Sequence, residues 1–237
     1  MQRSHIIMTI LRLLFLALLT APAMAMNAME LLIKVDTYRS PFLHAQLDIR
    51  IDEYKNDIIE KSQNYTVFHQ DGQSLVSVLD GSDKDNRILL SNKGMFVAPK
   101  NSSRAVRITP IQRLLGQASY GDLAGLRLSK NYTPSIIEQK PNTTILELIA
   151  KKSSATYHKI ILLIDSTDQR PISANAYLRS GKLYKKMHYN VKEKILNSIT
   201  YTSKNKSKKT VMNFLNITAK KIPKRLLTSQ GMRNAIR

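Results

Sequence analysis

The chain of 237 residues is long enough for one domain with appendages, and its 43% hydrophobic content is enough for a buried core, which excludes wholesale disorder. The absence of cysteine excludes disulfides, thiolate nucleophiles and cysteine-based metal sites. The formal charge of +20 gathers at the end of the chain, where residues 182–237 hold fifteen Lys or Arg against one acid, Glu193.

Residues 1–25 have the pattern of a secretory signal peptide. Two arginines, Arg3 and Arg12, precede an apolar segment over 13–21, and a small-residue cleavage site ends at Ala25. We therefore expect cleavage after Ala25 and export to the periplasm. Two alternatives stay open: the true start is Met1 or Met8, and the segment could remain as an anchor, although it is shorter than the ~20 residues of a membrane-spanning helix.

Hydrophobic periodicity predicts one helix and then a succession of strands. Apolar residues recur at helical spacing over 28–40, and Pro41 stops this helix. From His44 to Tyr54 apolar and polar residues alternate, which predicts a strand with one polar face. Further strands are predicted at 65–70, 73–80, 87–92, 94–99, 104–109, 143–150, 157–165, 172–179, 182–189, 198–203 and 209–217.

Turns and loops separate these strands. Asp71-Gly72 and Ser180-Gly181 predict two-residue hairpin turns. Residues 112–132 lose the alternation and are expected to form a loop with short helical turns, and a last short helix is expected within 223–236.

About a dozen antiparallel strands with few helices predict an α+β fold with a large curved sheet. One face of this sheet is polar, and the few helices can cover the other, apolar face only thinly. The resulting apolar concavity is a plausible lipid site. The expected organisation is a signal peptide (1–25), a lipid-binding domain (26–218) and a basic C-terminal tail or short helix (219–237).

No motif for catalysis survives inspection. In "GQASYGDLAG" (116–125) the glycines around Ser119 have the wrong spacing for a nucleophile elbow, and no Lys completes a phosphate loop. The histidines are scattered singly on strands, where surface positions are usual, and form no metal-binding pair. We expect no catalytic residue, metal or cofactor, and we interpret Asp122 as the N-cap of a short helix that starts at Leu123.

The order of motifs resembles the outer-membrane lipoprotein-sorting-like proteins, relatives of the periplasmic lipoprotein carrier LolA. The first part is "GMFVAPKNSSRAVRITPIQRLLGQASYGDLAG" (94–125), and the second includes "RPISANAYLRSGKLYKKMHY" (170–189); together the resemblance covers about Val35 to Tyr189. The family's aromatic strand commonly carries Trp, for which Phe96 is the nearest substitute. The residues that match the family's corner are Gly116, Gln117, Ser119, Gly121, Asp122, Leu123 and Tyr132.

The resemblance implies a half-open β-barrel with helices over an apolar cavity. It also implies non-enzymatic carriage or sensing of lipid or lipoprotein acyl chains between the inner and outer membranes, with an inner-membrane lipid or lipoprotein transporter as a possible partner. The alternatives are an envelope protein-docking or transporter-accessory module without lipid cargo, and a hydrolase, which is disfavoured. The strand residues expected to line the cavity, or else to form ordinary core, are Leu47, Ile49, Ile51, Val76, Val78, Phe96, Leu146 and Leu148.

The basic C-terminal region does not match the family. Export makes nucleic acid an improbable partner, so an anionic membrane surface is the more available one. The alternative is that these lysines only keep the strands soluble.

Overall fold

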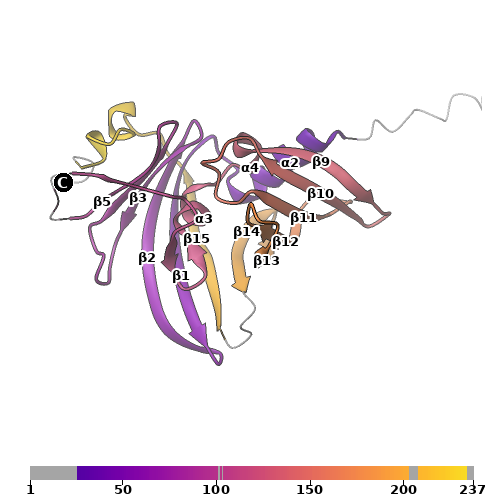
Figure 1. Cartoon of the computed structure of the whole chain (residues 1–237), viewed down its shortest axis with the longest axis horizontal. Coiled ribbons are helices and arrows are strands. Elements are labelled where there is room, and N and C mark those ends of the chain that lie inside the picture. The colour runs from indigo at the N-terminus through magenta and orange to yellow at the C-terminus, as the bar shows by residue number, and fades with distance from the viewer. Residues whose placement is uncertain (1–25, 101, 103, 203–207, 234–237) are drawn as a thin grey trace, which may run out of the picture.

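The computed structural model describes residues 26–100, 102, 104–202 and 208–233, so the expected signal peptide lies outside the described residues. Within them, thirteen antiparallel strands form one open sheet in the order β6-β5-β4-β3-β2-β1-β15-β14-β13-β12-β11-β10-β9, and β7 and β8 form a separate ribbon. This confirms the α+β fold with a large curved antiparallel sheet (Figure 1).

The strands are β1 (His44–Lys55), β2 (Ile58–Gln70), β3 (Gln73–Val78), β4 (Arg87–Ser91), β5 (Gly94–Ala98), β6 (Val106–Ile108), β7 (Arg113–Leu115), β8 (Ala118–Ser119), β9 (Tyr132–Gln139), β10 (Thr143–Ala150), β11 (Lys159–Asp165), β12 (Pro171–Tyr177), β13 (Leu183–Lys192), β14 (Ile195–Thr202) and β15 (Lys208–Ala219). The helices are α2 (Ala28–Arg39), α3 (Tyr120–Ala124) and α4 (Leu128–Asn131), followed by the 3₁₀ turns η1 (Lys224–Leu226) and η2 (Gly231–Arg233). Of the helices in the described part of the chain, none has the length and apolar content that a membrane crossing requires.

The predicted first helix is confirmed as α2. Asn27 caps it: the Asn27 side chain accepts a hydrogen bond from the Glu30 backbone N–H (2.9 Å), and the Glu30 carboxylate accepts one from the Asn27 N–H (3.0 Å). Its apolar face buries Leu32 and Val35 completely against the sheet. Two terminal donors are thus satisfied, and the helix is held by packing of one face.

The alternation over β1 is also confirmed, with Leu47, Ile49 and Ile51 on the buried face. The opposite face is less wet than expected, because Asp52 is 1% exposed. Its carboxylate accepts hydrogen bonds from Ser62 on β2 (2.6 Å) and from a residue on β15. β1 lies between these two strands, so a carboxylate here is covered by its neighbours rather than by water.

One strand was not predicted, and one predicted turn is wrong. No strand was predicted where β9 lies; most of its residues are exposed, and Pro134 is tolerated there because β9 is an edge strand. The predicted two-residue turn at Ser180-Gly181 is wrong, because the Leu178 N–H bonds to the Lys182 carbonyl and spans a longer loop. The Asp71-Gly72 turn is confirmed, with φ of 54° and 79°.

The short helices lie inside the curve of the sheet (Figure 1). α3 packs against β2, β3 and β4, whereas α2 packs against α4, β9 and β14. The helices therefore cover both flanks of the concave face.

The outer face is not polar throughout, contrary to expectation. Leu75 and Leu89 point away from the concavity and pack with Ile222, Leu227 and Met232 of the C-terminal segment. The end of the chain therefore closes a second, smaller core over β3 and β4, and the expected short helix there consists of two 3₁₀ turns.

Candidate functional site

The concave face brings together seven of the eight residues expected to line a cavity. Each of these seven is no more than 3% exposed, and all lie in one apolar cluster with residues of α2 and α3: Leu47, Ile49, Ile51, Val76, Val78, Leu146 and Leu148. Phe96 is the exception, because its neighbour Met95 takes the concave face of β5. Alternation then directs Phe96 to the outer face, where it packs with the C-terminal segment.

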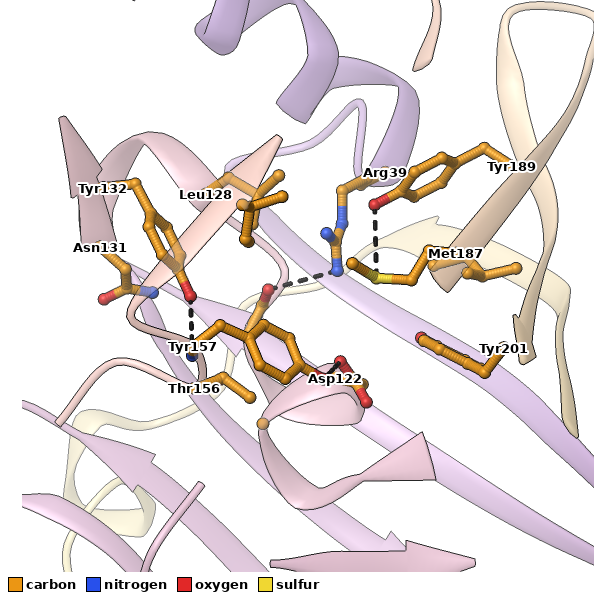
Figure 2. Close-up of a pocket in the computed structure, with 14 residues that line it drawn as sticks. Arg39, Asp122, Leu128, Asn131, Tyr132, Thr156, Tyr157, Met187, Tyr189 and Tyr201 are labelled. Atoms are coloured by element: carbon orange, nitrogen blue, oxygen red, sulfur yellow. Dashed lines mark hydrogen bonds between the residues drawn. The ribbon is translucent and has the colours of Figure 1, made fainter. Parts of the chain in front are cut away.

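A small cavity of about 30 Å³ lies inside the concavity, with room for about two water molecules. Figure 2 shows its lining, which comes from α2, the α3–α4 segment, the loop between β10 and β11, and strands β9, β11, β13 and β14. The tyrosines Tyr132, Tyr157, Tyr189 and Tyr201 supply much of that lining. In this state the protein's own side chains fill the concave face.

The corner 116–125 folds as a tight loop followed by α3. The helix begins at Tyr120 with Ser119 as its N-cap, so the N-cap role expected for Asp122 is wrong. Asp122 instead stands at the third helical position and returns the cap, since its carboxylate accepts a hydrogen bond from the Ser119 N–H (2.8 Å). The sequence Ser-x-x-Asp forms this reciprocal box as Ser-x-x-Glu does elsewhere.

Two glycines are required by the shape of the corner. Gly116 has φ of +55°, and a side chain there would collide with Thr210 of β15. Gly121 lies so close to Thr156 and Pro110 that a Cβ would overlap both. Between them, the Gln117 N–H donates to the Thr210 hydroxyl (2.8 Å), which fixes the loop to the centre of the sheet.

A buried ion pair joins α3 to the sheet. The Lys185 ammonium on β13 donates to the Asp122 carboxylate (2.7 Å) and to the Gln117 carbonyl. The Tyr157 hydroxyl donates to the other carboxylate oxygen at 2.6 Å (Figure 2). The side chains of Lys185 and Asp122 are 1% and 5% exposed, so this is an ion pair withdrawn from water.

Aromatic rings surround the ammonium group. Its nitrogen lies 5.4 Å from the ring centres of Tyr157 and Tyr184 and 5.1 Å from that of Tyr201. The ring faces attract a cation, and this supplements the single carboxylate. A lysine in the interior is thereby fully compensated.

The pKa values follow from this burial. Desolvation by itself raises the pKa of Asp122, but the charge and hydrogen bond of Lys185, with the bond from Tyr157, outweigh it and hold the pKa below its usual value. Burial, and then the Asp122 charge, raise the pKa of Tyr157 and of Tyr201 well above the usual value. The carboxylate thus stays ionised and the phenols stay neutral at ordinary pH.

Further bonds hold the other end of α3. The Ser74 hydroxyl on β3 donates to the Ala124 carbonyl (2.6 Å) and accepts from the ring nitrogen Nδ1 of His69 (2.9 Å). The Arg39 guanidinium on α2 donates to the Gly125 carbonyl (3.3 Å; Figure 2). His69 is 2% exposed, so the expected surface position is wrong for this one of the strand histidines; burial lowers its pKa to about 4.

The matched corner residues thus meet at one place, and Tyr132 reaches it by accepting a hydrogen bond from the Tyr157 N–H (3.1 Å). Sequence reasoning missed Lys185, Tyr157 and Arg39. A signal existed for Lys185: in "LYKKMHY" it shares the parity of Met187 and Tyr189, and that face is the buried one. Its charge made the alternation hard to see.

The polar contacts at this site hold α3 against the sheet. Asp122 is saturated with donors, and the Ser119 hydroxyl donates to it rather than to a free base. Within the described residues, no cluster of histidines and acids is arranged to bind a metal ion. The network tethers α3 inside the concave face by charge, hydrogen bonds and apolar contacts.

Comparisons with known proteins agree with this architecture. A family model described as "-like: Uncharacterized protein" matches residues 70–234, which is more than half of the chain. No curated protein matches it. A LolA superfamily protein from Nitrosomonas europaea is similar, at 25% identity with a TM-score of 0.78, over 86% of this chain and 98% of that one.

Two more distant structures share the fold. A protein described as an outer membrane lipoprotein-sorting protein domain, from Vibrio parahaemolyticus, is 13% identical with a TM-score of 0.66 over 87% and 98% of the two chains. A DUF1329 family protein from Desulfovibrio piger is 15% identical with a TM-score of 0.65 over 84% and 95%. The chain therefore belongs to the family of the model that matches residues 70–234, and its fold is LolA-like.

Proposed function

We propose that this protein is a periplasmic, non-enzymatic carrier or sensor of lipid or lipoprotein acyl chains between the inner and outer membranes. The observation that carries the proposal is the apolar concave face of an open sheet. Short helices cover this face, each held by its own contacts, and no second large sheet packs on it among the described residues. The names of the relatives, which include lipoprotein sorting, point the same way.

The filled interior sets a condition on such a carrier. A cavity of about 30 Å³ cannot hold an acyl chain, so cargo has to displace part of the α3–α4 segment. Burial of each CH₂ contributes about 0.8 kcal/mol, and a chain of a dozen carbons contributes on the order of 10 kcal/mol before ordering costs. That is enough to offset the rupture of several contacts of the short helices.

The first test asks which lipid or acylated peptide co-purifies with the protein. The chain is expressed with its leader in a host with a Gram-negative envelope, purified from the periplasm and extracted with organic solvent. Mass spectrometry of the extract should find a lipid or acylated peptide in stoichiometric amount. Binding of octanoic, decanoic and lauric acids is then measured by calorimetry, and each added CH₂ should tighten Kd by up to about fourfold.

An alternative function is supported by the edge strand β9. Ile136 and Ile137 are 37% and 52% exposed there, and an open edge can pair with a strand of a partner protein. A lipid-free extract together with no fatty-acid binding would refute the carrier. If the variant Ile137→Lys then failed to bind an envelope protein that the wild type binds, and its thermal unfolding were unchanged, a docking module would be favoured.

A further inference from the structure

Two adjoining pockets open beside the buried cavity. Their volumes are about 520 and 400 Å³, and they share Ile111, Ala155 and the segment 151–153. Asn131 lines both the larger pocket and the buried cavity, and Thr156 and Tyr157 line both the smaller pocket and that cavity. We call the two pockets together the vestibule, since they border the buried cavity; Figure 2 shows Asn131 and Thr156 together on one side of the cavity.

The vestibule is strongly basic. Five exposed cations line it, and within the described residues the acid among its lining is Asp71: the cations are Arg107, Lys130, Lys151, Lys152 and Arg179. In the part of the chain that the structure describes, no ion pair involves any of these five.

This lack of pairing is a local feature. Elsewhere exposed lysines do find acids, as Lys100 does with Asp85 (2.7 Å) and Lys140 with Glu138 (2.6 Å). Cations of one sign around a hollow repel one another and concentrate anions there. Repulsion among these cations slightly destabilises the protein without a ligand, and a bound anion removes this destabilisation.

The position of the cations indicates what kind of anion. Lysine and arginine are strong donors to phosphate, and Ser153 and Ser154 add hydroxyls in the same pocket. Behind them lies an aromatic and aliphatic interior that suits a hydrocarbon chain. We propose that the vestibule binds the phosphate group of an anionic amphiphile whose chain enters the concave face; this rests on the proposed carrier function.

The test compares two single-chain ligands that differ in the phosphate. Lauroyl lysophosphatidic acid and monolaurin carry the same acyl chain, and calorimetry measures the binding of each to the mature protein. We expect the phosphate ligand to bind at least tenfold more tightly, with a preference that shrinks in high salt. The variant Arg107→Ala/Lys152→Ala should lose most of this preference and keep its affinity for monolaurin.

A matched control removes the same charge elsewhere. Lys186 and Lys192 are exposed on β13 and line neither pocket, so Lys186→Ala/Lys192→Ala should keep the preference. Equal affinities for the two ligands, or a preference that survives in the vestibule variant, would refute the headgroup site and leave the carrier standing. Binding of neither ligand would refute both proposals. Inorganic phosphate is titrated separately; binding as tight as that of the amphiphile would assign the vestibule to free phosphate and overturn the link to a chain.

Discussion

The buried cavity and the vestibule both use lysines, but in opposite ways. Lys185 is withdrawn from water and is paired with Asp122 and surrounded by three aromatic rings, whereas Lys151 and Lys152 are exposed and form no ion pair within the described residues. Burial forces the first into a saturated network, because an unpaired charge there costs several kcal/mol. The other two ammonium groups stay accessible from solvent, and that of Lys151 also donates to the Ser129 carbonyl (2.8 Å). Positive charge thus fastens the fold in one region and can attract a ligand in the next.

The largest expected effect comes from breaking the interior pair. Lys185→Met leaves the Asp122 carboxylate buried with no counter-charge, so the free energy of unfolding should fall by about 3–5 kcal/mol. Lys186→Met changes the adjacent lysine, which lies exposed on the other face, and should stay within about 0.5 kcal/mol. Urea unfolding followed by far-UV circular dichroism measures both.

The double variant Lys185→Met/Asp122→Asn tests the cause of that loss. It removes both charges, so it should recover part of the stability and cost less than the sum of the single changes. Additive losses would mean that the two side chains act independently and that the ion pair is not what tethers α3.

The next effect concerns the room inside the cavity. Leu128 is 7% exposed and lines it, so Leu128→Ala should lower the free energy of unfolding by about 2–4 kcal/mol. Lauric acid should bind at least as tightly as to the wild type, because less of the closed packing has to be displaced. Leu215→Ala, at a side chain 56% exposed, is the control for both measurements. Weaker lauric acid binding in Leu128→Ala alone would argue against the concave face as the site.

A smaller effect should appear with acid. Burial, with Arg127 and His44 nearby, lowers the pKa of His69 to about 4, below its unfolded value of about 6.5. The unfolded chain therefore binds the proton first, and stability that is complete above pH 6.5 is lost as the pH falls toward 4. Between neutral pH and pH 4.5 the loss from this group should be about 2 kcal/mol.

The variant His69→Asn isolates this contribution. Asparagine keeps a donor for the Ser74 hydroxyl but does not titrate, so the variant should be less stable at pH 7 yet lose less on acidification. Equal pH slopes in the wild type and the variant between pH 6.5 and 4.5 would show that His69 does not control acid stability.

The sequence predicted the sheet because alternation is a local signal. The alternating positions of apolar residues show which face of a strand is buried, whichever strand pairs with it. This holds for Leu47, Ile49 and Ile51 on β1 and for Leu146 and Leu148 on β10. The edge strand β9 lacked that signal, since exposed strands carry no burial pattern and Pro134 argued against one. The cover of the outer face was equally hidden, because three apolar residues in a basic segment show no period.

The site was harder to predict because it is made by long-range contacts. The resemblance to the family located Ser119, Asp122 and Tyr132 and indicated a corner there. Nothing local revealed that Lys185, 63 residues later, answers Asp122. A buried lysine is stabilised only by its partner, so residue type alone favours the surface for it. Whether such a lysine is buried depends on a charged partner that the fold brings to it from a distant part of the sequence.

The smallest expected effect on stability belongs to the vestibule. Arg107→Ala/Lys152→Ala removes two exposed cations that form no ion pair in the described part of the chain. The free energy of unfolding should change by no more than about 0.5 kcal/mol, toward higher stability if repulsion among the five cations is felt. Urea unfolding at low and high salt measures this, and any gain should vanish at high salt. A loss above about 1 kcal/mol would mean that these side chains support the fold as Lys185 does. The contrast between the two regions would then fail, because charge selected for structure would explain both.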